Sequence, residues 1–73
     1  MNDYAFGNEL CRLRREAGLS QSALGQLLDV SNKAVSKWET GKAKPTTDTL
    51  RKLSAIFHIS IDTLLCLRPR SAG

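Results

Sequence analysis

The spacing of apolar residues restricts this chain to helical folds. Apolar side chains recur at intervals of three or four residues along nearly the whole sequence, and no stretch alternates between apolar and polar residues as a half-buried strand does. At the start of the chain, Phe6, Leu10, Leu13 and Ala17 fall on one face of a helix. The sequence of 73 residues therefore predicts an all-α fold.

Residues that commonly begin or end helices divide the chain into five helical segments. Side-chain oxygens of Ser, Thr, Asp and Asn accept hydrogen bonds from the first backbone N–H groups of a helix, and Gly often follows its last turn. The predicted helices cover residues 3–17, 21–28, 32–40, a segment from Thr46 or Thr47 to 57, and 61–67, with starting caps at Asn2 or Asp3, Ser20, Ser31, Thr46 or Thr47, and Ser60. Their short connections indicate one compact domain over residues 1–67, followed by a flexible basic tail over residues 68–73.

The composition favours a binding protein with a polyanionic partner. Eleven Lys and Arg residues against seven Asp and Glu residues give a net charge of +4. Aromatic residues make up 5% of the chain, which is too few for a surface that stacks single-stranded bases. No Cys and His spacing resembles a metal site, so no metal or other cofactor is implied. The two cysteines could form one disulfide by count, but without a signal peptide Cys11 and Cys66 are expected as reduced thiols.

The sequence also argues against an enzyme and against a membrane protein. It contains no paired carboxylates, no nucleophile with a matching base and no Gly-rich phosphate loop. No apolar run approaches the ~20 residues of a membrane helix, and the first residues, MNDYAFGNEL, do not resemble a signal peptide. We therefore expect a soluble, cytoplasmic protein.

The second and third predicted helices form a helix-turn-helix unit over residues 21–40. They are joined by a turn of about three residues, which is the arrangement that places the second helix in the DNA major groove. Gly25 would permit a helix to cross closely over it, and Asp29 tolerates the positive φ that the turn needs. Val35 is the predicted buried anchor of helix 32–40, with Trp38 as its other core residue.

Several segments at fixed distances resemble one known family. They are Gly18-Leu19-Ser20-Gln21, Leu24-Gly25, the run VSNKAVSKWETGK from Val30 to Lys42, Pro45-Thr46, and Leu50 with Leu53. This pattern, which extends from about Phe6 to Leu65, resembles the phage repressor/Cro-type helix-turn-helix family, also called the XRE family. The resemblance implies a lambda-repressor-like five-helix fold and a sequence-specific, double-stranded-DNA-binding regulator of transcription, most often a repressor. Asp29 and His58 stand where the family usually carries Gly.

The resemblance also assigns roles to individual residues. Base contacts in the major groove are implied for Asn32, Lys33, Ser36 and Lys37, whose side chains suit adenine and guanine edges. Contacts to the DNA backbone are implied for Ser20, Gln21, Arg14, Thr40, Lys42 and Lys44. An ion pair between Arg14 and Glu39 would fix the orientation of helix 32–40. From the charges alone, all of these residues could instead form a solvated surface.

Some alternatives stay open from the sequence. Specific binding by such a domain normally uses a homodimer on a two-fold DNA site. Ile59, Ile61, Leu64 and Leu65 could contribute to a dimer contact or complete the core. A further C-terminal domain or a protein partner could lie beyond this chain. The competing function is a protein-interaction module, such as an antitoxin or adaptor, although the cationic helix 32–40 lacks the apolar anchors that such a module uses.

Overall fold

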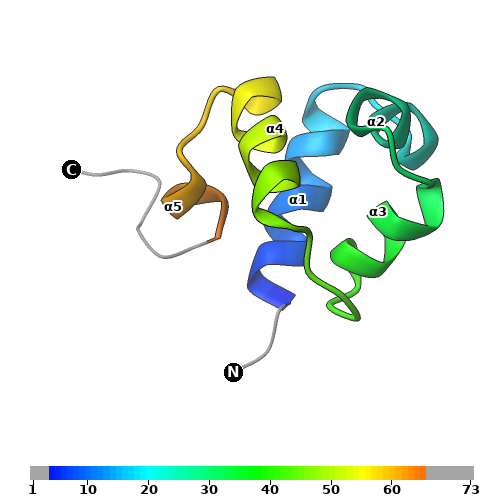
Figure 1. Ribbon diagram of the computed structural model, residues 1–73, viewed down its shortest axis with the longest axis horizontal. Coiled ribbons are helices and arrows are strands. Elements are labelled where there is room, and N and C mark those ends of the chain that lie inside the picture. Colours follow the sequence, from blue (N-terminus) through cyan, green and yellow to red (C-terminus); the bar gives the residue numbers. More distant parts are fainter. Residues whose placement is uncertain (1–3, 66–73) are drawn as a thin grey trace.

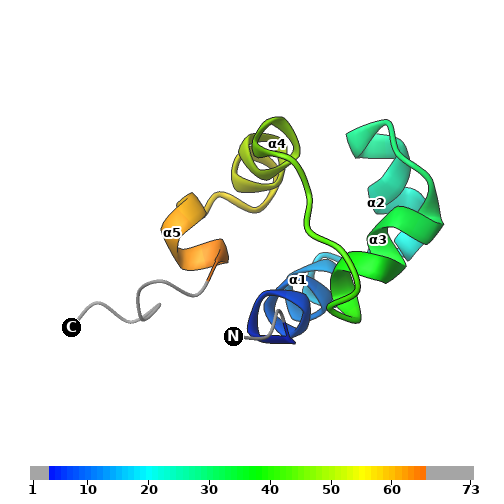
Figure 2. The same ribbon diagram turned by 60° about the horizontal axis from the view of Figure 1, so that its bottom comes forward.

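The computed structural model describes residues 4–65, and all elements in this part of the chain are α-helices. They are α1 (Tyr4–Glu16), α2 (Gln21–Leu28), α3 (Asn32–Glu39), α4 (Thr47–Phe57) and α5 (Ile61–Leu64). Figure 1 shows α1 near the centre, with α2 and α3 on one side and α4 and α5 toward the other, and Figure 2 shows α4 above α1. The prediction of an all-α fold with five helices is confirmed for these residues.

Hydroxyl side chains begin four of the five helices. In each case the cap oxygen accepts a hydrogen bond from the backbone N–H three residues later, at 3.0 to 3.3 Å. Such caps each stabilise a helix by about 1 kcal/mol. The four caps are Ser20, Ser31, Thr46 and Ser60, which confirms the predicted starts and selects Thr46 over Thr47. The predicted cap at Asn2 or Asp3 lies outside the described residues.

Four helices end at or next to a residue in the left-handed region, and one of these is α3, which is followed by Gly41 with a φ of 77°. Gly18 follows α1 with a φ of 74°, Asp29 caps α2 with a φ of 61°, and His58 caps α4 with a φ of 57°. Asp and His therefore adopt the conformation for which Gly is the usual residue, as the sequence predicts.

The predicted end of the first helix was wrong by one residue. Ala17 is exposed and follows the last residue of α1, so it does not extend the apolar face. The backbone N–H of Gly18 donates to Arg15 at 3.0 Å and that of Leu19 to Arg14 at 3.1 Å, which closes the helix end and turns the chain. As a result Leu19, rather than Ala17, packs against the core.

Two other predicted helices are longer than the observed ones. Helix α3 ends at Glu39, with Thr40 as its cap residue, and α5 ends at Leu64, with Leu65 as its cap residue. Residues 66 and 67 and the predicted tail over residues 68–73 lie outside the described residues.

The core is built around α1 and receives side chains from all five helices. Within α4 and α5 only Leu53 and Leu64 are buried, whereas the other predicted core positions there, including Phe57 and Ile61, are partly exposed. The core residues are Phe6, Leu10, Leu13, Leu24, Leu28, Val35, Trp38, Leu53 and Leu64. None of the helices described is both long enough and apolar enough to cross a membrane.

Candidate nucleic-acid interface

The turn between α2 and α3 is tightly packed against α2. The backbone N–H of Val30 donates to the carbonyl of Gly25 at 2.8 Å, and Asp29 supplies the left-handed residue. A Cβ on Gly25 would lie 2.7 Å from the Val30 carbonyl oxygen and 3.3 Å from the Ser31 carbonyl carbon. The sequence predicts a close contact at Gly25, and the structure has one, but the contacting segment is the turn just before α3 and not a crossing helix.

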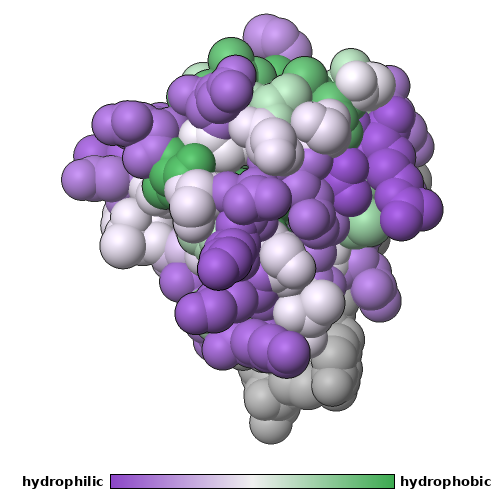
Figure 3. Space-filling model, turned by 90° about the vertical axis from the view of Figure 1, so that its right-hand side faces the viewer, coloured by the Kyte–Doolittle hydropathy of each residue, from purple (hydrophilic) through white to green (hydrophobic). Residues whose placement is uncertain are grey.

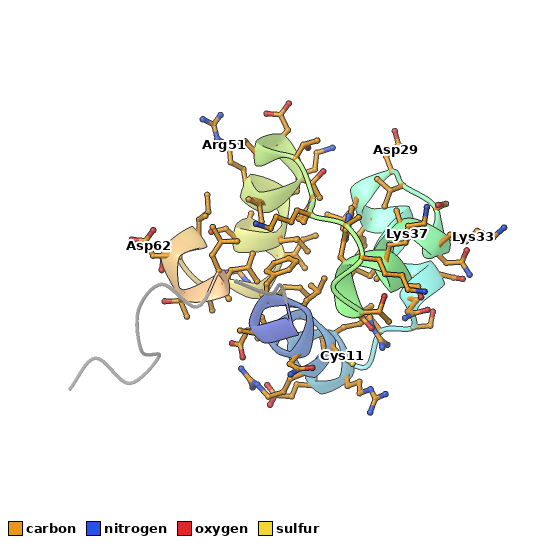
Figure 4. The ribbon with its side chains drawn as sticks, turned by 90° about the horizontal axis from the view of Figure 1, so that it is seen from below. Cys11, Asp29, Lys33, Lys37, Arg51 and Asp62 are labelled. Atoms are coloured by element: carbon orange, nitrogen blue, oxygen red, sulfur yellow. The ribbon has the colours of Figure 1, made fainter. Side chains whose placement is uncertain are left out.

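Helix α3 presents one side to the core and the other to solvent. Val35 is fully buried and Trp38 is 6% exposed, so Trp38 is a core residue as predicted. Asn32, Lys33 and Lys37 are exposed, whereas Ser36 is half-buried. Lys33 and Lys37 project from α3 at the opposite end of the molecule from Arg51 and Asp62 (Figure 4).

The surface around α3 is polar. Figure 3 looks at the side of the molecule that carries α2 and α3, and hydrophilic residues cover most of it. Apolar residues lie mainly along its upper edge (Figure 3). Among the described residues, the large apolar side chain with high exposure is Leu27 on α2, at 58%. The exposed side of α3 therefore offers hydrogen-bond donors and positive charge, which are the groups that contact DNA bases and phosphates.

A buried carboxylate links α3 to both preceding helices. Arg14 of α1 donates from Nε to Glu39 Oε2 at 2.6 Å and from Nη2 to Glu39 Oε1 at 3.1 Å. Gln21 of α2 donates from Nε2 to the same Oε1 at 3.1 Å. The Arg14 and Glu39 side chains are only 10% and 6% exposed, and Arg14 Nη1 also donates to the Leu19 carbonyl at 2.9 Å. The ion pair that the family resemblance implies is thus present, and Gln21 extends it.

Both partners of this pair are ionised at neutral pH. Burial by itself raises the pKa of Glu39, but hydrogen bonds from Arg14 and Gln21 and the charge of Arg14 outweigh burial and lower the pKa below its usual range. The hydrogen bond to Glu39 raises the pKa of Arg14, against the opposing effect of burial. The end of α3 is therefore held by a charged, hydrogen-bonded contact.

The residues predicted to contact DNA backbone differ in their availability. Ser20 is exposed, and its Oγ accepts from the N–H of Ala23, which leaves the hydroxyl hydrogen to donate elsewhere. The Thr40 hydroxyl instead donates back to the carbonyls of Ser36 and Lys37 at 2.9 and 3.3 Å. A phosphate contact from Thr40 therefore requires its side chain to leave these carbonyls.

The remaining members of that set flank α3. Lys42 and Lys44 are exposed in the loop that follows the helix, and Gln21 is half-buried with its amide turned to Glu39. Arg14 is buried, with 10% of its side chain exposed. The structure thus brings Arg14 and Gln21 together at the end of α3, and it places Lys42 and Lys44 at exposed positions in the following loop.

Sequence reasoning missed the role of Gly7 in this region. A Cβ on Gly7 would lie 2.5 Å from the Glu39 carbonyl oxygen and 2.8 Å from the Trp38 carbonyl oxygen, so α1 and the last turn of α3 touch backbone to backbone. The available signal was a glycine inside an apolar helical pattern, the same signal that singled out Gly25.

The cysteines and acidic residues do not form a metal site in the described part of the chain. No group of three or more His, Cys, Asp or Glu side chains is placed to hold a metal ion among these residues. Cys11 is a free thiol, and Arg14 Nη2 lies 3.7 Å from its sulfur. Cys66 lies outside the described residues.

The helix-turn-helix family model matches residues 12–64, which is more than half of the chain. The chain belongs to the phage repressor/Cro-type (XRE) helix-turn-helix family. It is 42% identical over 60 residues to the HTH-type transcriptional activator BcrR of Enterococcus faecalis, and the matched residues make up 82% of this chain and 29% of BcrR. It is 35% identical over 65 residues to repressor protein C2 of Salmonella phage P22, and the matched residues make up 89% of this chain and 30% of that repressor.

The similarity extends to solved structures. The P22 c2 repressor in complex with a synthetic operator superposes with a TM-score of 0.77 at 34% identity, over 81% of this chain and 89% of that chain. The lambda-repressor-like fold is therefore confirmed. The hydroxypropylphosphonic acid epoxidase of S. wedmorenis contains the same fold, with a TM-score of 0.76 and 25% identity over 34% of its chain. The two sequence relatives named above are regulators of transcription and not enzymes, which agrees with the sequence prediction. This chain spans less than a third of either one.

Proposed function

We propose that this chain is a sequence-specific, double-stranded-DNA-binding domain of a cytoplasmic transcription regulator, acting as a repressor with α3 in the major groove. The observation that carries the proposal is the two-sided character of α3. Val35 and Trp38 anchor it, while its solvent side carries polar and cationic residues that contribute nothing to the core. The fold of a repressor bound to its operator supports the same placement.

In this proposal the exposed side of α3 reads the base sequence. Asn32 pairs with an adenine edge, and Lys33 and Lys37 donate to guanine N7 and O6. Ser36 is half-buried and has a short side chain, and in this proposal its hydroxyl hydrogen-bonds a base edge. Each good base contact contributes about 1–3 kcal/mol of discrimination against the wrong base.

A second set of residues binds phosphates and orients the domain. Ser20 and Gln21 lie at the start of α2, where backbone N–H groups and the helix dipole favour an anion. Lys42 and Lys44 supply charge beyond the other end of α3, and Arg14 contributes through the 10% of its side chain that is exposed. Thr40 joins this set only after its hydroxyl turns away from α3. These contacts position α3 without reading sequence.

Two copies of the domain bind one operator in this proposal. One domain inserts one helix into one groove, so a homodimer reads two half-sites about 34 Å apart, or a multiple of that distance. The half-buried Ile59, Ile61 and Leu65 supply apolar contact area for the second copy, whereas the fully buried Leu64 belongs to the core.

The test begins with selection of tight binders from a pool of random duplex DNA. We expect a two-fold symmetric motif, and salt titration of its binding should give a steeper loss for a scrambled duplex than for the selected one. A single short half-site would contradict the homodimer. No enrichment, with only weak salt-sensitive binding, would contradict the proposed function and favour the protein-interaction module.

Variants of matched charge separate the two sets of contacts. Lys33→Ala should relax the preference at one base pair by about 1–3 kcal/mol, whereas Lys42→Ala should weaken binding to all duplexes and reduce the salt slope by about one unit. Lys52→Ala, on the exposed side of α4, is the control and should change neither quantity. Equal losses on selected and scrambled DNA for Lys33→Ala would reassign Lys33 to phosphate contact.

A further inference from the structure

A glycine of another helix lies against the turn that leads into α3, and a second one lies against the last turn of α3. At the start of α3, Gly25 of α2 lies beneath the backbone of Val30 and Ser31. At its end, Gly7 of α1 lies beneath the carbonyls of Trp38 and Glu39. At both places a Cβ would come within 3.0 Å of backbone oxygen, closer than ordinary van der Waals contact allows. The turn before α3 and the last turn of α3 are therefore both held by backbone contacts in which no side chain intervenes.

We propose that Gly7 is a positioning residue for DNA recognition, because the missing side chain sets the tilt of α3 on the domain. This inference rests on the proposed function. Gly7 touches no DNA in this account. It acts by letting the last turn of α3 approach α1, which fixes Lys37 and Asn32 relative to the residues that bind phosphate.

The size of the effect follows from the length of α3. Eight residues make a helix about 12 Å long, since each residue rises about 1.5 Å. Restoring normal contact to a Cβ on Gly7 would open the gap at the end of α3 by roughly 0.5–1 Å. If the turn on Gly25 holds the start, α3 tilts by roughly 2–5°, and the backbone at Lys37 moves by up to about 0.6 Å, while that at Asn32 moves much less. Functional sites tolerate displacements of about 0.5 Å, so the upper part of this range is large enough to weaken a base contact of Lys37.

The surrounding contacts prevent α3 from relieving this clash in other ways. The atoms that face Gly7 are backbone carbonyls, which cannot rotate aside as a flexible side chain does. Glu39, whose carbonyl meets Gly7, is tied through its carboxylate to Arg14 on the same helix as Gly7, at 2.6 Å. Trp38 is buried against the core. Movement of the whole of α3 away from α1 would expose both Val35 and Trp38. A tilt about the start of α3 keeps Val35 in place and strains only the contacts of the last turn, so this tilt is the expected response.

The test compares Gly7→Ala with Asn8→Ala, its exposed neighbour on α1. Affinities are measured for the duplex selected from the random pool and for a scrambled duplex, at a temperature where thermal unfolding shows both variants to be folded. We expect Gly7→Ala to lose about tenfold in affinity for the selected duplex, while its affinity for the scrambled duplex stays within about twofold, because phosphate contacts carry no sequence information. Asn8→Ala should match the wild type on both.

The outcomes distinguish this inference from the function on which it rests. If the wild-type chain prefers no duplex, the proposed function fails. If the wild type is selective and Gly7→Ala loses equally on both duplexes, or on neither, Gly7 does not position α3 for recognition and the inference is overturned.

If Gly7→Ala does not fold, NMR of the wild type tests whether α3 stays against Gly7 when the protein binds DNA. The nuclear Overhauser effect between the Gly7 α-protons and the Thr40 amide proton should be present in the free and the DNA-bound protein. Its loss on binding the selected duplex would overturn the inference, because α3 would then read DNA away from its seat on Gly7.

Discussion

Replacement of Glu39 by Gln tests how strongly the buried ion pair holds the domain together. The substitution keeps the shape of the side chain and an oxygen that accepts a hydrogen bond, but it removes the negative charge. Arg14, whose side chain is 10% exposed, would then be a buried cation without a counter-charge. With the amide oxygen in the Oε1 position, Gln21 and Arg14 Nη2 still donate to it, but the amide nitrogen then faces the Arg14 Nε–H donor, and that hydrogen bond is lost. The effect on stability therefore reports on the charge and on this hydrogen bond rather than on packing.

The expected loss is large for a domain of 73 residues. Removal of one partner of a buried pair costs about 3–5 kcal/mol, and the retained hydrogen bonds place Glu39→Gln near 3 kcal/mol. In a domain of this size 1 kcal/mol corresponds to about 4–8 °C in Tm, so the midpoint should fall by roughly 12–24 °C. The free energy of unfolding of small domains starts at about 5 kcal/mol, which exceeds the expected loss, so the variant should remain folded at low temperature.

Glu16→Gln is the matched control, because it also breaks an ion pair with an N···O distance of 2.6 Å. Glu16 is 60% exposed, and its partner Arg12 keeps a second pair with Glu9 at 2.7 Å. Exposed ion pairs contribute little to the free energy of unfolding, so this variant should unfold at the same urea concentration as the wild type.

Urea unfolding of both variants, followed by circular dichroism at low and high salt, measures the difference. The loss in Glu39→Gln should persist in high salt because the pair is shielded from solvent ions. Equal, small losses in the two variants, or a Glu39→Gln loss that salt abolishes, would refute the argument that burial decides the strength of the pair.

Three further predictions concern stability. The pKa of Glu39 is lowered in the folded chain. Its contribution to folding stability is therefore complete above the unfolded pKa of about 4.3 and is lost as the pH falls through the folded pKa. Urea unfolding between neutral pH and about pH 3 should show this loss of stability in the wild type, and the Glu39→Gln variant should lack it. Asp29→Gly should raise stability by about 0.5–1 kcal/mol, because Gly adopts the left-handed conformation without strain, and a lower Tm would contradict this. Gly25→Ala should lower the Tm although Ala is the better helix former by about 1 kcal/mol, because its Cβ would meet the Val30 carbonyl, and an increase would show that the turn can move aside.

Local chemistry explains why the helix boundaries were largely predictable. A serine such as Ser20 or Ser31 caps a helix through a bond to an N–H three residues away, so its effect is contained in a few consecutive residues. The same holds for the left-handed residues Asp29 and His58, whose backbone preference is intrinsic. Val35 and Trp38 were predicted as core because their spacing places them on one face of the helix.

Contacts between distant segments were harder to predict. Gly7 meets Glu39 across 32 positions of sequence, and nothing near Gly7 shows which backbone lies above it. The Gln21 amide could have faced solvent or DNA, and only the folded arrangement shows that it joins Glu39. Thr40 resembles a phosphate ligand in sequence, yet its hydroxyl turns back to its own helix. The pairing of Arg14 with Glu39 was accessible through family resemblance and not through the charges alone.

In the proposed function, the division of α3 into an anchored side and a solvent side separates heritable change in specificity from change in stability. Substitutions at Asn32, Lys33 and Lys37 alter exposed side chains, whereas the fold depends on Val35 and Trp38. A lineage can therefore acquire a new target by drift at a few surface positions without first passing through unstable intermediates. The same independence makes α3 a suitable place to graft the recognition residues of a relative onto this scaffold.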